Sequence, residues 1–120
     1  MPSAGLLIIG NEILSGKVVD TNSPFLAGEL RELGVDLERI LVIPDEIETI
    51  AAEVRRMSEN YDHVFTSGGI GPTHDDLTMD GVALAFERSL KLNSTIWERI
   101  ERSQQGSPNE AMRKMAIVPE

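Results

Sequence analysis

Apolar positions along the chain follow two alternating spacings, and together they predict an α/β domain. Continuous apolar runs at Leu6–Ile9, at the end of Val35–Ile43 and within Tyr61–Thr66 are typical of strands buried in a parallel sheet. Helical spacing of apolar residues, with a Ser-Pro start and a Gly stop in the first case, predicts helices over Ser23–Gly34 and Asp45–Asn60. This order favours right-handed crossovers, with helices on both faces of the sheet.

The second half of the chain is predicted to be helical. Thr78 is expected to cap a helix, a further one starts near Asn93 or Ser94, and Asn109–Met115 could form a short last helix before a strand near Ile117. We expect the apolar helical stripes to form the core, including Phe25, Leu26, Leu30 and Leu33, and we expect apolar surface around Trp97 and Ile100 to need a partner. Three strands make a narrow sheet, so residues 1–120 are expected to be a single domain that lacks its C-terminal part.

Composition narrows the possible partners. The 120 residues carry a net charge of −9 and no basic stripe, which disfavours nucleic acids and anionic membranes. The apolar run near the N-terminus is too short for a signal peptide or a membrane span, and the lack of cysteine is consistent with the cytoplasm. An anionic small ligand would have to be held locally, by backbone N–H groups or by a metal.

Each predicted strand leads at its carboxyl end into a polar or glycine-rich segment. Ligands bind at this edge of parallel sheets, so the three segments are expected to form one site. The first segment contributes the candidate ligand-binding residues Gly10, Asn11, Glu12, Ser15, Gly16 and Asn22. The second contributes Asp45, and the third contributes Ser67, Gly68, Gly69, Gly71, Pro72, Thr73, Asp75 and Asp76.

The third segment points to a phosphate ligand. Its glycines allow the backbone to come close to a ligand. Its N–H groups, together with the N-terminus of the helix that follows, would attract an anion. Asp75 and Asp76 would repel phosphate unless a divalent cation such as Mg²⁺ lay between them. Simple helix capping is the alternative explanation for Asp75 and for Asp45. The segment lacks the Lys-Ser/Thr of a Walker loop, and the first turn, GNEILSG, is not a dinucleotide fingerprint.

These motifs resemble one known family. The segments Gly10–Gly16, Asp20–Asn22, Val42–Glu46 and Ser67–Thr78 are similar to the ordered motifs of the MoaB/Mog molybdopterin-binding superfamily. Within it they most resemble the N-terminal domains of CinA-type proteins and the similar domain of FAD synthases. The resemblance implies a three-layer α/β/α fold with a mainly parallel sheet and a nucleotide or pterin ligand over the glycine-rich loop. It also places Asp45 and Asp76 where Mog-type enzymes carry a functional acidic pair.

One departure from the family pattern separates two hypotheses. Asp75 stands where Mog enzymes have Arg, which favours a metal-bridged pyrophosphate over pterin adenylylation. The first hypothesis is therefore a metal-dependent pyrophosphatase acting on ADP-ribose or FAD-like dinucleotides, with Asp45 and Asp76 as catalytic and metal-binding residues. The second is a molybdopterin adenylyltransferase or a non-catalytic binding module. A homo-oligomer is expected, with a dimer favoured by the CinA resemblance.

Overall fold

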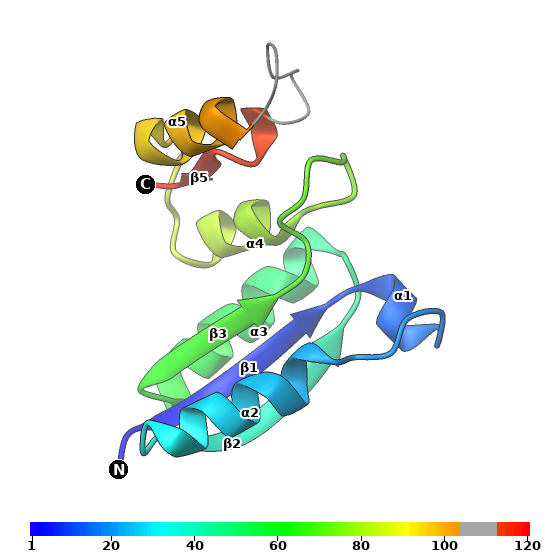
Figure 1. The fold of residues 1–120 in the computed structure, drawn as a ribbon, viewed down its shortest axis with the longest axis vertical. Coiled ribbons are helices and arrows are strands. Elements are labelled where there is room, and N and C mark those ends of the chain that lie inside the picture. The colour runs from blue at the N-terminus through cyan, green and yellow to red at the C-terminus, as the bar shows by residue number, and fades with distance from the viewer. Residues whose placement is uncertain (104–112) are drawn as a thin grey trace.

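The computed structural model describes residues 1–103 and 113–120, and its centre is a parallel sheet (Figure 1). The strands β1 (Ser3–Ile9), β2 (Asp36–Ile43) and β3 (His63–Ser67) lie in the order β2-β1-β3. Ile9 pairs with Ile43 on one side of β1, and Ile8 pairs with Ser67 on the other. The run Leu6–Ile9 is almost completely buried, as its unbroken apolar sequence predicted.

Two helices cover opposite faces of this sheet. In Figure 1, α2 (Asn22–Glu32) lies in front of the strands and α3 (Ile47–Asn60) lies behind them. The buried residues of α3 recur at helical spacing and pack with Leu7 and Ile9 in the core: Ile50, Ala51, Val54 and Met57. The predicted three-layer α/β/α fold is confirmed.

The apolar stripe of α2 is less buried than predicted. Leu30 is buried, but Phe25 and Leu33 are 68% and 75% exposed. The helix packs against β2, the edge strand, and this narrow sheet offers too little surface to cover the whole stripe. The helix also begins at Asn22 rather than after Ser23, because the Asp20 carboxylate accepts hydrogen bonds from the backbone N–H groups of Asn22 and Ser23.

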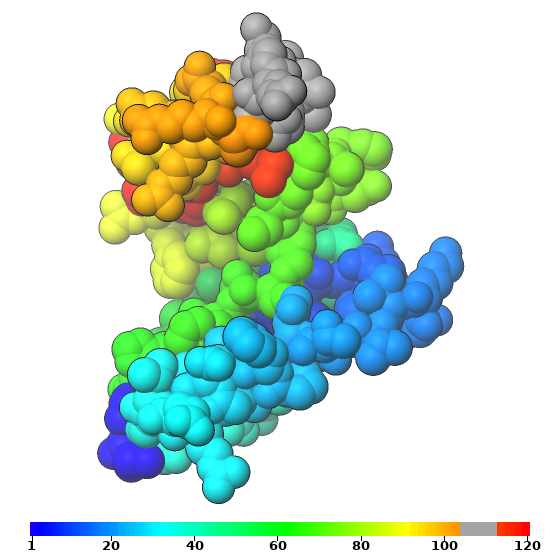
Figure 2. All heavy atoms as spheres, in the orientation of Figure 1, coloured from blue at the N-terminus to red at the C-terminus, as the bar shows by residue number. Residues whose placement is uncertain are grey.

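The second half of the chain adds a lobe that the apolar pattern did not predict. After α4 (Thr78–Ala85) come β4 (Leu90–Leu92), α5 (Ser94–Ser103) and β5 (Ile117–Pro119). The strand expected near Ile117 exists, but it pairs antiparallel with β4 in a separate two-stranded sheet. Figure 2 shows this upper lobe set off from the parallel sheet and joined to it through α4. Most of the helix expected at Asn109–Met115 lies outside the described residues.

No helix in the described part of the chain is both long and apolar enough to cross a membrane.

Candidate functional site

The segments after β1 and β2 are tied together at the carboxyl edge of the sheet. The N–H of Gly10 donates to the carbonyl of Ile43 at 3.0 Å. Beyond this bond, the N–H of Asn11 donates to Asp45 Oδ2 and the N–H of Asp45 donates to Asn11 Oδ1, both at 3.2 Å. This reciprocal pair holds the Asp45 side chain across the gap between the two segments. The segment also contains a short helix that the sequence did not predict, α1 (Asn11–Leu14).

The segment after β3 joins the first segment through a different bond. Asn22 Nδ2 donates to Ser67 Oγ at 2.8 Å, across 45 positions of sequence. A hollow of about 170 Å³ lies here, with Glu12, Asp20, Asn22, Ser67 and Gly68 among its lining residues. The hydroxyl of Ser23, with the N–H groups of Ser23 and Asn22, lowers the pKa of Asp20 against the opposing effect of burial. The three predicted segments therefore meet, as expected.

A second hollow, of about 450 Å³, gathers carboxylates from all three segments. Its lining residues are Asn11, Glu12, Ser15, Lys17, Asp45 and Asp75. In the described residues, no three His, Asp or Glu side chains form a ready-made metal site. The donor chemistry still fits Mg²⁺, a hard cation that commonly takes one or two carboxylates and fills its remaining positions with water and phosphate oxygens.

Two glycines of the third segment, Gly68 and Gly69, are required by packing. Gly68 and Gly69 have φ of +94° and +68°, in the left-handed region that favours glycine. A Cβ on Gly68 would lie 2.1 Å from the carbonyl oxygen of Ile9, and one on Gly69 would lie 2.1 Å from Thr78 Oγ1. Thr78 does not cap α4 as predicted: it is the first residue of the helix, and its buried hydroxyl donates to the carbonyl of Gly68 at 2.8 Å.

Asp76 is turned into its own loop. Its Oδ2 accepts hydrogen bonds from the N–H of Thr73 at 2.9 Å and from Thr73 Oγ1 at 2.7 Å. Partial burial raises the pKa of Asp76, but the bonds from Thr73, the N–H of Gly71 and the charge of Lys114 outweigh it, so the net pKa lies below the ordinary value. The exposed residues Pro72, Thr73 and Asp75 form the outer turn of this loop.

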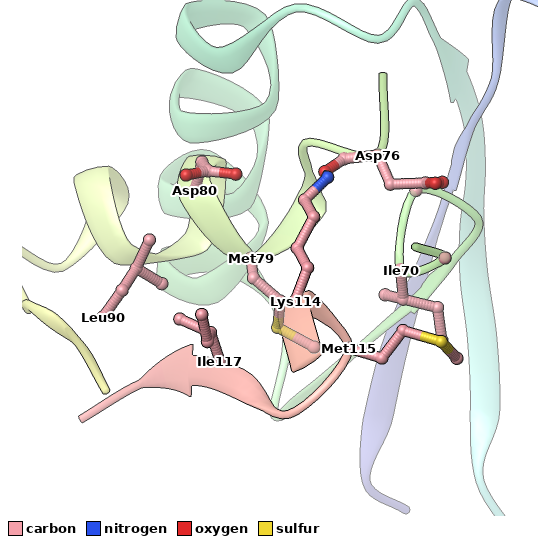
Figure 3. Close-up of a pocket in the computed structure, with 10 residues that line it drawn as sticks. Ile70, Asp76, Met79, Asp80, Leu90, Lys114, Met115 and Ile117 are labelled. Carbon is pink, nitrogen blue, oxygen red and sulfur yellow. The ribbon is translucent and has the colours of Figure 1, made fainter. Parts of the chain in front are cut away.

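The two carboxylates expected to form an acidic pair line different hollows. Asp76 faces a hollow of about 150 Å³ between the loop and the upper lobe, together with Met79, Asp80 and Lys114 (Figure 3). Asp75 rather than Asp76 shares the larger hollow with Asp45. The carbonyl of Ile9, which packs closely against Gly68, directly precedes Gly10. Gly16, with φ +81°, ends the turn after α1.

Two lysines were missed by sequence reasoning, one in the hollow of Asp45 and one in the separate hollow of Asp76. Lys17 follows Gly16 directly, so a cation beside the GNEILSG turn was a usable signal. Lys114 lies 38 positions beyond Asp76, and nothing in its local pattern marks it as a site residue. Its position beside the loop comes from the way the upper lobe folds back onto α4.

The fold is that of an α/β domain in which the segments after three parallel strands gather at the carboxyl edge of the sheet. A family model described as a probable molybdopterin binding domain matches residues 5–118, and the chain belongs to this family. The crystal structure of a protein called CinA from Thermoplasma acidophilum is 33% identical, with a TM-score of 0.90 over 98% of this chain and 70% of that one. The molybdopterin biosynthesis enzyme MoaB from Thermus thermophilus, at 20% identity and a TM-score of 0.67 over 93% of this chain and 70% of its own, shares the fold.

Relatives in longer proteins carry the same domain. A probable FAD synthase from Caenorhabditis briggsae is 47% identical over 100 residues, which are 83% of this chain and 19% of that protein. A CinA-like protein from Citrifermentans bemidjiense is 40% identical over 117 residues, 95% of this chain and 28% of its own length. The chain spans about half or less of the length of the curated relatives it matches.

Proposed function

We propose that this domain binds the phosphates of a nucleotide or pterin ligand at the carboxyl edge of the sheet and hydrolyses a pyrophosphate in a divalent-metal-dependent reaction. The substrate class is ADP-ribose or an FAD-like dinucleotide. One observation carries the proposal: Glu12, Asp45 and Asp75, from three segments, line one hollow of about 450 Å³ together with Lys17. Carboxylates beside a phosphate site repel the ligand unless a cation lies between them.

Each side chain is assigned a role from its position in the structure. Asp45, held by the backbone N–H of Asn11, would bind the metal together with Asp75. Lys17 would offset the negative charge of the pyrophosphate from the same hollow. A bound Mg²⁺ would supply Lewis-acid polarisation of the phosphoryl oxygens. Asp76 is assigned a supporting role, since its carboxylate fixes the turn that presents Asp75.

The direct test is cleavage of ADP-ribose and FAD with and without Mg²⁺. Cleavage by the unmodified chain should require the metal, and Asp45→Asn should reduce the rate by roughly 100-fold or more, because it removes a charged oxygen ligand. Asp36→Asn is the matched control, since Asp36 is an exposed carboxylate at the far end of β2. Absence of cleavage at every metal concentration would refute the hydrolase.

The family match favours a second candidate, a molybdopterin-binding module or adenylyltransferase. The domain belongs to a family described as molybdopterin-binding, and it shares the MoaB fold. This function predicts tight binding of molybdopterin and no cleavage of ADP-ribose or FAD at any Mg²⁺ concentration. Calorimetry and a product assay on the same sample would distinguish it from the hydrolase. Asp45 serves both functions, whereas Asp75 as a metal ligand serves the first.

We further propose that the chain works in the cytoplasm as a homodimer that contacts neither nucleic acid nor membrane. None of the residues of α5 is fully buried, and Ile96, Trp97 and Ile100 remain partly exposed on one side. Light scattering should therefore show a mass of about twice 13.2 kDa at micromolar concentration. A monomer throughout that range would contradict the dimer.

A further inference from the structure

Lys114 connects the upper lobe to the glycine-rich loop. Its Nζ donates hydrogen bonds to the backbone carbonyls of Thr73 and Asp76, which lie 41 and 38 positions away in sequence. Figure 3 shows the side chain extended from the segment before β5, with its ammonium group beside Asp76. Both acceptors belong to the turn that carries Asp75.

We propose that Lys114 is a positioning residue for this turn, and that the upper lobe thereby controls the geometry of the candidate site. The role deepens the proposed function, since the turn it fixes presents Asp75 to the hollow of Asp45. Lys114 itself lines the separate hollow beside Asp76, so it acts through the backbone of the loop.

The physical basis is the geometry of the turn. The carbonyl of Thr73 also accepts the N–H of Asp76 at 3.2 Å, while the Asp76 carboxylate accepts the N–H of Thr73 at 2.9 Å. These internal bonds close the turn, and the ammonium group satisfies its two carbonyls from outside. Hydrogen bonds to a charged donor are about twice as strong as neutral ones.

Electrostatics supports the same role. Asp75, Asp76 and Asp80 bring three carboxylates into a short stretch at the start of α4. Lys114 lies in the same hollow as Asp76 and Asp80, and its charge contributes to lowering the pKa of Asp76. A cation there reduces repulsion within the turn before any ligand arrives.

Native-state hydrogen exchange tests the proposal without a ligand. In Lys114→Met, the amides of Thr73 and Asp76 should exchange roughly 10-fold faster or more, because loss of charged hydrogen bonds lets the turn open. Amides of β1 such as Leu7 should be unchanged. Lys114→Arg, which keeps the charge and the donors, should restore much of the protection.

Lys91→Met provides the matched control. Lys91 lies on β4 in the same lobe, 3.9 Å from a Glu120 oxygen and 72% exposed, so its removal should leave the loop amides unchanged. Unchanged exchange at Thr73 and Asp76 in Lys114→Met would overturn the proposal. So would an acceleration that extends equally to β1, since that would indicate general destabilisation.

A kinetic measurement connects this role to the site. If the turn presents Asp75 to a metal, Lys114→Met should raise the Mg²⁺ concentration for half-maximal ADP-ribose cleavage by roughly 10-fold, with a smaller change in the rate at saturating metal. An unchanged Mg²⁺ requirement in an active enzyme would overturn the link to the site. If the unmodified chain cleaves nothing, the proposed function fails, while the exchange data still decide whether Lys114 positions the turn.

Discussion

Asp45 and Asp76 each follow a strand of the parallel sheet, but different neighbours hold their carboxylates. Asp45 is bound by the backbone of Asn11 in another segment, and it faces a hollow of about 450 Å³ with other carboxylates. Asp76 is bound by Thr73, three positions earlier in its own loop. A carboxylate held across a gap remains available to an external cation, whereas one that closes its own turn mainly determines the shape of that turn.

The largest expected effect is the loss of stability when a side chain at Gly68 pushes the glycine-rich segment away from β1. Gly68→Val should destabilise the fold by more than about 3 kcal/mol, because its Cβ would overlap the carbonyl of Ile9 and its φ of +94° is strained for valine. Thermal unfolding measures this effect. Gly28→Ala in α2, where a Cβ meets nothing within 4 Å, is the control and should be neutral or slightly stabilising. Equal melting temperatures for the two variants would show that the fold does not depend on the close approach of Gly68 to the carbonyl of Ile9.

The next effect distinguishes Asp75 from Asp76 by the Mg²⁺ requirement of their variants. Asp75→Asn should raise the Mg²⁺ concentration needed for ADP-ribose cleavage by roughly 10-fold or more, because Asp75 shares the hollow of Asp45. Asp76→Asn should change this requirement much less, since an amide oxygen can still accept the bonds from Thr73. Rate against metal concentration gives the answer, and the reverse order would restore Asp45 and Asp76 as the metal pair.

The effects on stability should be smaller, and here substitution of Asp76 should matter more than substitution of Asp75. Asp76→Ala removes two hydrogen bonds from Thr73 and should cost about 1–2 kcal/mol in free energy of unfolding. Asp75→Ala should cost less than about 0.5 kcal/mol, because this side chain is 79% exposed and its contact is His74 at 3.3 Å. Chemical denaturation of both variants tests the difference, and a larger loss in Asp75→Ala would contradict the assignment of Asp76 to the turn.

The smallest effect concerns pH. The pKa of Asp76 is below its ordinary value of 3.8 in the folded chain, so the ionised form stabilises the fold. This contribution is fully present above the ordinary pKa and is lost as pH falls through the lower folded pKa. The difference in melting temperature between the unmodified chain and Asp76→Asn should therefore be constant above about pH 5 and shrink below 3.8. A difference that grows on acidification would reverse the assigned shift.

Local pattern was sufficient for the parallel sheet and its covering helices. β1 is buried on both faces and α3 on one face, and each kind of burial leaves its own local pattern: an unbroken apolar run in β1 and helical spacing in α3. The short strand Leu90–Leu92 and its pairing with β5 were missed, because three residues carry too little periodicity to distinguish a strand. The exposure of Phe25 and Leu33 also depends on sheet width, which no single helix encodes.

The sequence by itself determined that three acidic and glycine-rich segments would meet at one edge, because parallel strands end on the same side of their sheet. It also determined the family, through motifs between Gly10 and Thr78 that the family match over residues 5–118 confirms. Only the tertiary structure decided which aspartate faces which hollow. Asp75 and Asp76 are adjacent and chemically identical, so the bonds that Thr73 and Lys114 make in the folded loop, and not residue type, set their directions.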